Sequence, residues 1–404
     1  MSNLGEFQAP ADVKRWRSTA LGIGGIALIA WLIGLYFSPE QALRSWLLGF
    51  IFWGGIGFGC IGVLMLQYLT GGALGVVIRR VTEAGSNTVP ILLLLFLPIA
   101  IGVNSLYEWT HLAPTEHVMV HRGWYMIAAS WLLRSAVYFA LFWIMTWYLT
   151  KWSKLQDRTT NPEDSAVYLG KATAFSGPSI IIWTLVVSFA AVDWVMTLDP
   201  HFFSTIWGLL FVAGWGLSCF CFVVTVLAFL SDKPPMDRVL GKRHFHDLGK
   251  LMLAMVMVWA YFNFSQFLII WSGNIPEETG WFLTRMKGGW GWIGVILILF
   301  HFGFPFLVLL LQDFKRHAKR IAMLAIFILI MRVFDMFYLI GPNPRIALHG
   351  AEQGAFIVSW MDFVAPIAVG GIWLWWFFGE LLKRPLVPIN DPYLENAIHH
   401  GKGH

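Results

Sequence analysis

The chain has 404 residues, of which 57% are hydrophobic and only 13% are charged. Soluble globular domains carry about a quarter charged residues, so this composition excludes an ordinary soluble protein. The formal net charge of +5 does not indicate a nucleic-acid partner, because the basic residues are sorted between loops instead of gathered in one patch.

Ten segments are long and apolar enough to cross a bilayer, which requires roughly 20 residues per helical span. In chain order, we expect spans at 18–37, 46–69, 89–110, 124–150, 177–199, 202–230, 248–271, 288–312, 321–341 and 354–379. The predicted fold class is therefore all-α integral membrane, with about ten transmembrane helices. We expect a membrane domain over 18–382 between cytoplasmic tails at 1–17 and 383–404, with no cleavable signal peptide.

The loops between these spans alternate in charge. Of the 28 Lys and Arg residues, 21 fall in the two tails and in or at the edges of the loops after spans 2, 4, 6 and 8, whereas 5 fall in the opposite loops. Such a bias is the positive-inside signal. It predicts a multi-pass protein of the bacterial inner membrane with both termini in the cytoplasm.

Two similar segments indicate an internal repeat. The fifth span ends in "VDWVMTLDP" and the ninth in "FDMFYLIGP", so that Asp193 and Asp335 each precede a proline by seven residues. A weaker similarity relates 104–108 in the third span to 263–266 in the seventh. Both relate helices four apart in the same orientation. This predicts two parallel four-helix bundles, spans 2–5 and 6–9, flanked by spans 1 and 10, unlike the inverted repeats of many transporters.

Ionisable side chains inside spans are costly and usually face a bundle interior or a water-filled cavity. Three residues lie near the predicted midplane: Arg134, Arg332 and His301. The other polar side chains lie toward the outer side, first Asp193, Asp335, Asp362, Asn263 and Gln266, and then Asn104 and Glu108 toward the outer interface. Arg332 and Asp335 are three residues apart and are predicted to pair. Arg134 then pairs with Asp193 or Asp362.

Two interpretations of this polar layer stay open. The first is a set of buried ion pairs that fix helix registry. The second is a polar half-channel or a quinone head-group pocket that opens outward. Three acids face two arginines, and an acid without an arginine partner can pass protons. His301 is either a hydrogen-bonded core residue or part of such a path.

Sequence motifs for redox cofactors are absent. There is no CxxCH motif for c-type haem and no four-cysteine run for an iron–sulfur cluster. Cys60, Cys219 and Cys221 fall within spans and indicate packing rather than metal ligation. We therefore expect the chain to bind no metal and no redox cofactor of its own. The glycines of "GGIGFGCIG" (54–62) predict close helix packing.

Three segments carry a resemblance to a known family. They are "DWVMTLDPHFFSTIWG" (193–208), "WFLTRMKGGWGW" (281–292) and "MDFVAPIAVGGIWLW" (361–375). With ten spans and a four-plus-four core, the chain resembles the NrfD-like membrane subunits of quinol-linked oxidoreductases. More narrowly, it is similar to the ActF-like subunits of bacterial alternative complex III, a quinol:cytochrome c oxidoreductase. The resemblance covers essentially the whole membrane region, although Asp199-Pro200 stands where the family usually has Glu-Pro.

The resemblance implies a place in a membrane complex. Its expected partners are a multihaem cytochrome c subunit, an iron–sulfur subunit, the related NrfD-like subunit ActC and small transmembrane-helix subunits, so that haem c and iron–sulfur clusters belong to partners. In that family the quinol site is usually assigned to ActC, whereas the ActF-like chain has a structural role or carries a proton path. The matching candidates for a proton path here are Asp193, Asp199, Asp335, Asp362, Glu108 and His301.

We therefore expect a subunit without its own redox cofactor in a quinol:electron-acceptor oxidoreductase, whose acceptor is a cytochrome c or a copper protein. Two alternatives remain. A direct quinol-binding anchor predicts a lipid-accessible apolar cleft that ends at a His or Asp. A stand-alone ion-coupled transporter predicts broken helices and an inverted repeat.

Overall fold

The computed structural model describes residues 7–159, 161–346, 348 and 354–402. Within them every regular element is a helix, and ten helices are long and apolar enough to cross a membrane, which confirms the predicted fold class. These spans are α1 (Ala11–Phe37), α2 (Pro39–Thr70), α3 with α4 (Ala73–Ser86, Val89–Ile101), α7 (Ala128–Arg158), α8 (Pro162–Trp194), α9 (Trp207–Leu230), α11 (Lys242–Gly273), α13 with η4 and α14 (Gly288–Ile296, Leu297–Gly303, Phe304–Leu310), α16 (Ala318–Ile340) and α17 (Met361–Leu381).

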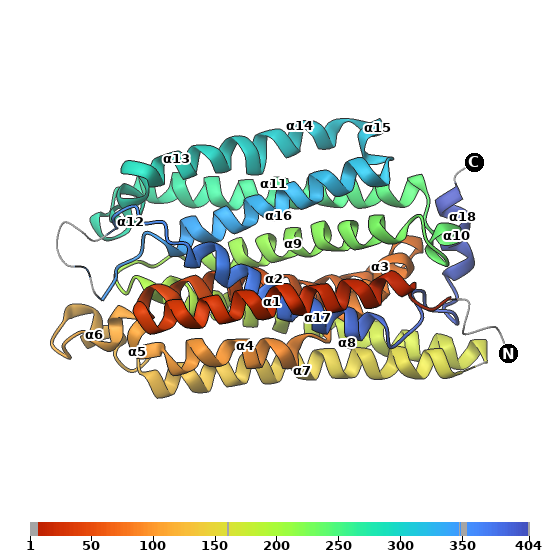
Figure 1. Cartoon of the computed structure of the whole chain (residues 1–404), viewed down its shortest axis with the longest axis horizontal. Coiled ribbons are helices and arrows are strands. Elements are labelled where there is room, and N and C mark those ends of the chain that lie inside the picture. The colour runs from red at the N-terminus through yellow and green to blue at the C-terminus, as the bar shows by residue number, and fades with distance from the viewer. Residues whose placement is uncertain (1–6, 160, 347, 349–353, 403–404) are drawn as a thin grey trace.

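Short helices connect the spans. At one end of the molecule lie α5 (Val103–Leu106), η2 (Glu108–Thr110), α6 (His117–Arg122), η3 (Met196–Leu198) and α12 (Pro276–Met286). At the other end lie α10 (Met236–Val239), α15 (Gln312–Lys315) and α18 (Leu394–Lys402), together with both chain ends (Figure 1). We call the second end the basic end, because it carries most of the Lys and Arg residues.

The spans form two bundles (Figure 1). The first consists of α2, α3–α4, α7 and α8, and the second of α9, α11, α13–α14 and α16. The bundles meet where α2 and α8 pack on α9, and where α16 packs on α2. The first and last spans, α1 and α17, run side by side, and α17 also covers α2. The predicted division into spans 2–5 and 6–9, flanked by spans 1 and 10, is therefore confirmed.

Glycines set the closest helix contacts. A methyl group on Gly59 of α2 would lie 2.5 Å from the backbone oxygen of Trp215 in α9. Likewise, a methyl group on Gly24 of α1 would lie 2.8 Å from the Cα of Gly371 in α17. Small residues at such crossings let backbones approach closely, as in other membrane bundles. The prediction that the glycine-rich stretch of the second span is a packing surface is confirmed.

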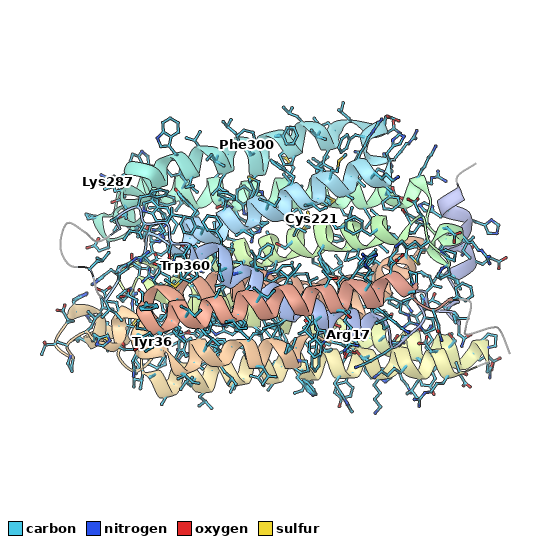
Figure 2. All side chains as sticks on the ribbon, viewed as in Figure 1. Arg17, Tyr36, Cys221, Lys287, Phe300 and Trp360 are labelled. Carbon is cyan, nitrogen blue, oxygen red and sulfur yellow. The ribbon has the colours of Figure 1, made fainter. Side chains whose placement is uncertain are left out.

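Burial separates central from peripheral helices. Nearly all of α2 and α9 is buried, whereas most apolar residues of α1, α11 and α13–α14 are exposed or only partly buried. Figure 2 shows side chains such as Tyr36 and Phe300 projecting from the outside of the bundle, and these two are 85% and 45% exposed. An apolar outer surface of this extent requires a lipid or protein environment. The chain is a multi-pass membrane protein.

Several predicted boundaries were wrong. The third span begins at Ala73, not 89, because Gly71 and Gly72 adopt φ values of 63° and 88° and separate it from α2. It ends at Ile101, not 110. The supposed loop 151–176 is mostly helical, since α7 and α8 extend beyond the apolar stretch and turn only at 159–161. There Asn161 accepts a hydrogen bond from the backbone N–H of Glu163 and caps α8.

The two tails also differ from the prediction. Helix α1 begins at Ala11, inside the predicted tail 1–17. The last span begins at Met361 rather than 354. The predicted tail 383–404, in which no helix was predicted, contains α18, which packs on α3, α10 and α11. Asp391 also pairs with Arg79 at 2.6 Å and anchors this segment.

Candidate functional site

A buried polar cluster joins all four helices of the second bundle. Arg332 and Asp335, one turn apart on α16, form an ion pair and are about 1% exposed. Arg332 donates from Nε to Ser218 Oγ of α9 at 3.3 Å, and Trp259 Nε1 of α11 donates to Asp335 at 3.1 Å. The His301 ring stacks on Trp259 with a centroid separation of 4.0 Å. The prediction that Arg332 pairs with Asp335 is confirmed.

His301 lies in η4, a π-helical segment within the eighth span. Pro305, four residues later, has no N–H to donate to the His301 carbonyl, which gives a local reason for the irregular helix. His301 is completely buried, and neither ring nitrogen has a hydrogen-bond partner among the described residues. On α11, one turn after Trp259, Asn263 donates to the Trp259 carbonyl at 2.9 Å, and Gln266 of the same helix is buried.

A second cluster lies in the first bundle. Arg134 of α7 donates from Nε and Nη2 to both carboxylate oxygens of Asp193 in α8, at 2.8 and 2.9 Å. The Tyr138 hydroxyl donates to the same carboxylate at 2.6 Å, and the Trp131 indole to the Asp193 carbonyl at 2.7 Å. The Arg134 guanidinium also lies 3.7 Å from the Tyr125 ring centroid. Burial and the Asp193 carboxylate raise the pKa of Tyr125. Of the two candidate partners for Arg134, the structure selects Asp193.

Asp193 and Asp335 each pair with an arginine, whereas Asp362 is held by hydrogen bonds from uncharged groups. Its carboxylate accepts hydrogen bonds from the Gln41 amide at 2.8 Å, the Ser45 hydroxyl at 2.5 Å and the backbone N–H of Ser359 at 2.8 Å. It lies in the first turn of α17, where the helix dipole favours a negative charge. Arg345 reaches this group indirectly by donating to Gln41 Oε1 at 2.5 Å. Asp362 therefore fixes the start of α17 against α2.

The remaining predicted residues lie outside these clusters. Asp199 follows η3 and accepts a hydrogen bond from the backbone N–H of His201 at 3.1 Å, so it acts in a turn. Glu108 begins η2 beyond the end of the third span. Asn104 is exposed in α5, and its carbonyl lies 2.7 Å from His111 Nε2. Asp199, Glu108 and Asn104 thus lie in the segments that connect the spans.

Two buried arginines that the sequence did not single out hold the end of α16. Arg285 of α12 donates to the carbonyls of Tyr338 and Leu339 at 3.2 and 2.9 Å. Its guanidinium lies 3.4 Å from the Trp281 ring centroid. Burial lowers the pKa of Arg285 to about 9, so it remains charged at neutral pH. Arg44 donates to the Asn343 carbonyl at 2.9 Å. Cations at a helix C-terminus complement its dipole.

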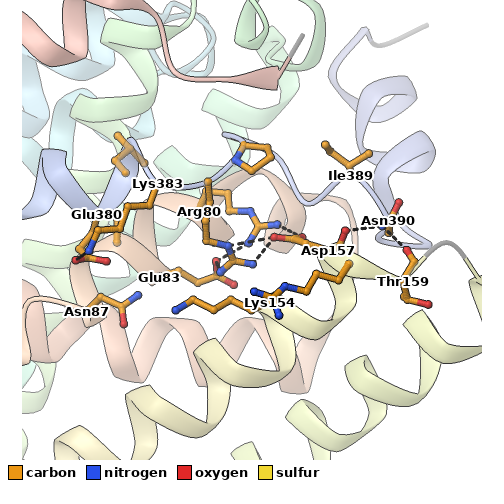
Figure 3. Close-up of a pocket in the computed structure, with 15 residues that line it drawn as sticks. Arg80, Glu83, Asn87, Lys154, Asp157, Thr159, Glu380, Lys383, Ile389 and Asn390 are labelled. Carbon is orange, nitrogen blue, oxygen red and sulfur yellow. Dashed lines mark hydrogen bonds and ion pairs between the residues drawn. The ribbon is translucent and has the colours of Figure 1, made fainter. Parts of the chain in front are cut away.

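A third network, also missed, lies at the basic end (Figure 3). Glu83 accepts hydrogen bonds from Arg80 at 2.7 Å and from Arg384 at 2.8 Å through one oxygen, and from Ser153 at 2.5 Å through the other. Asp157 pairs with both arginines. The predicted spans place Arg80 in the loop after the second span. The spacing in the sequence could have indicated this network. Arg80 and Glu83 are three residues apart, and Ser153 and Asp157 are four residues apart on the facing helix, so each pair shares a helix face.

The three groups differ in what they can do chemically. The Arg134–Asp193 pair and the basic-end network consist of ion pairs of the kind that can fix helix registry. The second-bundle cluster adds a titratable imidazole whose nitrogens have no protein partner among the described residues. Within the described chain, no three His, Cys, Asp or Glu side chains are grouped so as to hold a metal ion. No protein-family model and no curated protein matched this chain.

Proposed function

We propose that this chain is a membrane subunit of a quinol:electron-acceptor oxidoreductase complex, similar to the ActF-like chains. It carries no redox cofactor, holds the complex together in the membrane and contributes a proton-conducting group. The observation that carries the proposal is the second-bundle cluster. There His301 lies one aromatic ring away from the Arg332–Asp335 pair, inside a span that departs from α-helical geometry. Intramembrane ionisable residues and π-helical segments both concentrate at functional sites.

The two-bundle architecture supports the same proposal. Asp193 and Asp335 occupy the fourth helix of their respective bundles, and each is paired with an arginine. This is the parallel repeat that the sequence indicates. The apolar outer surfaces of α1, α11 and α13–α14 offer room for partner subunits as well as lipid.

The proposed orientation places the basic end in the cytoplasm. Both chain ends lie at this end, together with the loops that carry most of the Lys and Arg residues (Figure 1). Basic loops are retained on the cytoplasmic side during insertion. On this topology the chain lies in a bacterial inner membrane, and Asp193, Asp335 and Asp362 lie on the outer side of the bilayer.

The experiment that tests the proposal uses the whole complex. A strain lacking this chain would be complemented with the wild type or with His301→Phe, Asp335→Asn or Asp193→Asn. Quinol oxidation and proton release per electron would then be measured in membrane vesicles. His301→Phe keeps an aromatic ring against Trp259 and removes only the titratable nitrogens. We expect it to assemble and oxidise quinol but to release fewer protons per electron.

The controls separate the competing roles. His201→Phe, at an exposed histidine outside the spans, should behave as the wild type. The two Asp→Asn variants each leave an arginine without its carboxylate, so their assembly must be checked first. An unchanged proton ratio in assembled His301→Phe contradicts the proton-conducting role. Loss of quinol oxidation in assembled His301→Phe supports the direct quinol-binding anchor instead.

A further inference from the structure

A groove lies beside the C-terminal end of α17 at the basic end. Three adjoining pockets of about 630, 450 and 510 Å³ make it up, and Glu380 lines all of them. Neighbouring pockets also share Lys154, Trp376 and Lys383. Helices α1, α3, α7 and α17 supply its walls. Figure 3 shows the first pocket, with Lys154 beside the Arg80–Glu83–Asp157 network.

The charges in this groove do not balance. Arg80 and Arg384 are paired with Glu83 and Asp157, and Lys383 is paired with Glu380. Five further cations line the pockets, and none has a carboxylate within ion-pair distance among the described residues: Lys14, Arg17, Lys151, Lys154 and Arg158. The groove therefore keeps a surplus of positive charge that favours an anionic ligand.

The other lining residues show what kind of anion fits. Tryptophans face the groove where α7 and α17 approach the end of their apolar stretches: Trp143, Trp147, Trp375 and Trp376. Trp143 and Trp147 are each 48% exposed, and Ile144 between them is 45% exposed. Tryptophan is typical of the depth at which lipid head groups meet acyl chains. A soluble phosphate compound would use the cations but leave this apolar edge uncovered.

From these observations we infer that the groove binds the head group of an anionic glycerophospholipid. The phosphate contacts Lys151, Lys154 and Arg158, and the acyl chains lie along Trp143 and Trp147. Lys14 and Arg17 form a second cationic group beyond Trp376, so a lipid with two phosphates can contact both groups. Basic pockets between membrane helices at the cytoplasmic side bind such lipids elsewhere. The inference goes beyond the proposed function and does not depend on it.

The test measures lipid binding to the purified full-length chain by native mass spectrometry. After delipidation, cardiolipin, phosphatidylglycerol and phosphatidylcholine would be titrated separately. The wild type should bind the two anionic lipids more tightly than phosphatidylcholine. The triple variant Lys151→Gln/Lys154→Gln/Arg158→Gln should lose about tenfold or more in affinity for the anionic lipids, since each basic residue near the surface contributes to the attraction.

A matched control removes the same charge elsewhere at the basic end. Lys242→Gln/Arg243→Gln/Arg316→Gln alters three exposed residues on α11 and beside α15, and should keep the wild-type affinity. Equal affinity of the wild type for all three lipids overturns the inference without requiring any variant. Equal losses in the two triple variants also overturn it. If inorganic phosphate or ATP displaces the anionic lipid at similar concentration, the groove is a site for soluble phosphate compounds.

Discussion

For single residues, the sequence separation between two ionisable side chains decided whether their pairing could be predicted. Arg332 and Asp335 lie one helical turn apart, so their pairing followed from helix geometry alone. The choice between Asp193 and Asp362 for Arg134 required the packing of α7 on α8. The partners of Asp362 on α2 are more than 300 residues away in sequence, and no local pattern indicates them.

The network around Glu83 gives a prediction at this scale. Glu83→Gln removes the carboxylate charge that Arg80 and Arg384 share in a buried site. Breaking a buried ion pair lowers the free energy of unfolding by roughly 3 kcal/mol or more. We expect a clear fall in the thermal unfolding midpoint, measured in detergent by size-exclusion chromatography after heating. Glu380→Gln is the control, because its partner Lys383 is 64% exposed and such pairs contribute at most about 1 kcal/mol. Equal shifts would contradict the structural role assigned to Glu83.

At the scale of elements, hydropathy identified the ten spans but misplaced several of their ends. Apolar length follows the thickness of the bilayer. Helices α7 and α8, however, continue beyond their apolar stretches and meet only at the turn around Asn161, which caps α8. The π-helical segment around His301 was not predicted either. The sequence offers Pro305 as a cause, but a proline also produces a simple kink.

The contact between α1 and α17 supplies a prediction at this scale. In Gly24→Ala the new methyl group would lie 2.8 Å from backbone of Gly371, so the helices must move apart. Overpacking of this kind costs about 1–3 kcal/mol, and we expect a lower unfolding midpoint. Gly25→Ala, with nothing within 4 Å of the added methyl, should be neutral or slightly stabilising. The opposite order would show that α1 and α17 do not pack as described.

At the scale of the whole molecule, the repeat and the charge bias predicted two parallel bundles with both ends on one side. The bundles meet where α2 and α8 pack on α9 and where α16 packs on α2; α8 and α9 are consecutive spans, whereas α2 lies far from α9 and α16 in the chain. Sequence alone could not show that Arg79, Arg80 and Asp391 are buried at the basic end, because charged residues near span ends are normally counted as loop residues. The groove at the basic end likewise exists only once α1, α3, α7 and α17 are assembled.

We propose that this chain belongs to a quinol-oxidising complex. The most direct measurement is affinity purification of the tagged full-length chain from its native membrane in mild detergent, followed by haem staining and mass spectrometry. We predict that a multihaem cytochrome c, an iron–sulfur protein and a related ten-span subunit purify with it. A stable, haem-free chain that purifies without partners would contradict the claim and favour a stand-alone transporter.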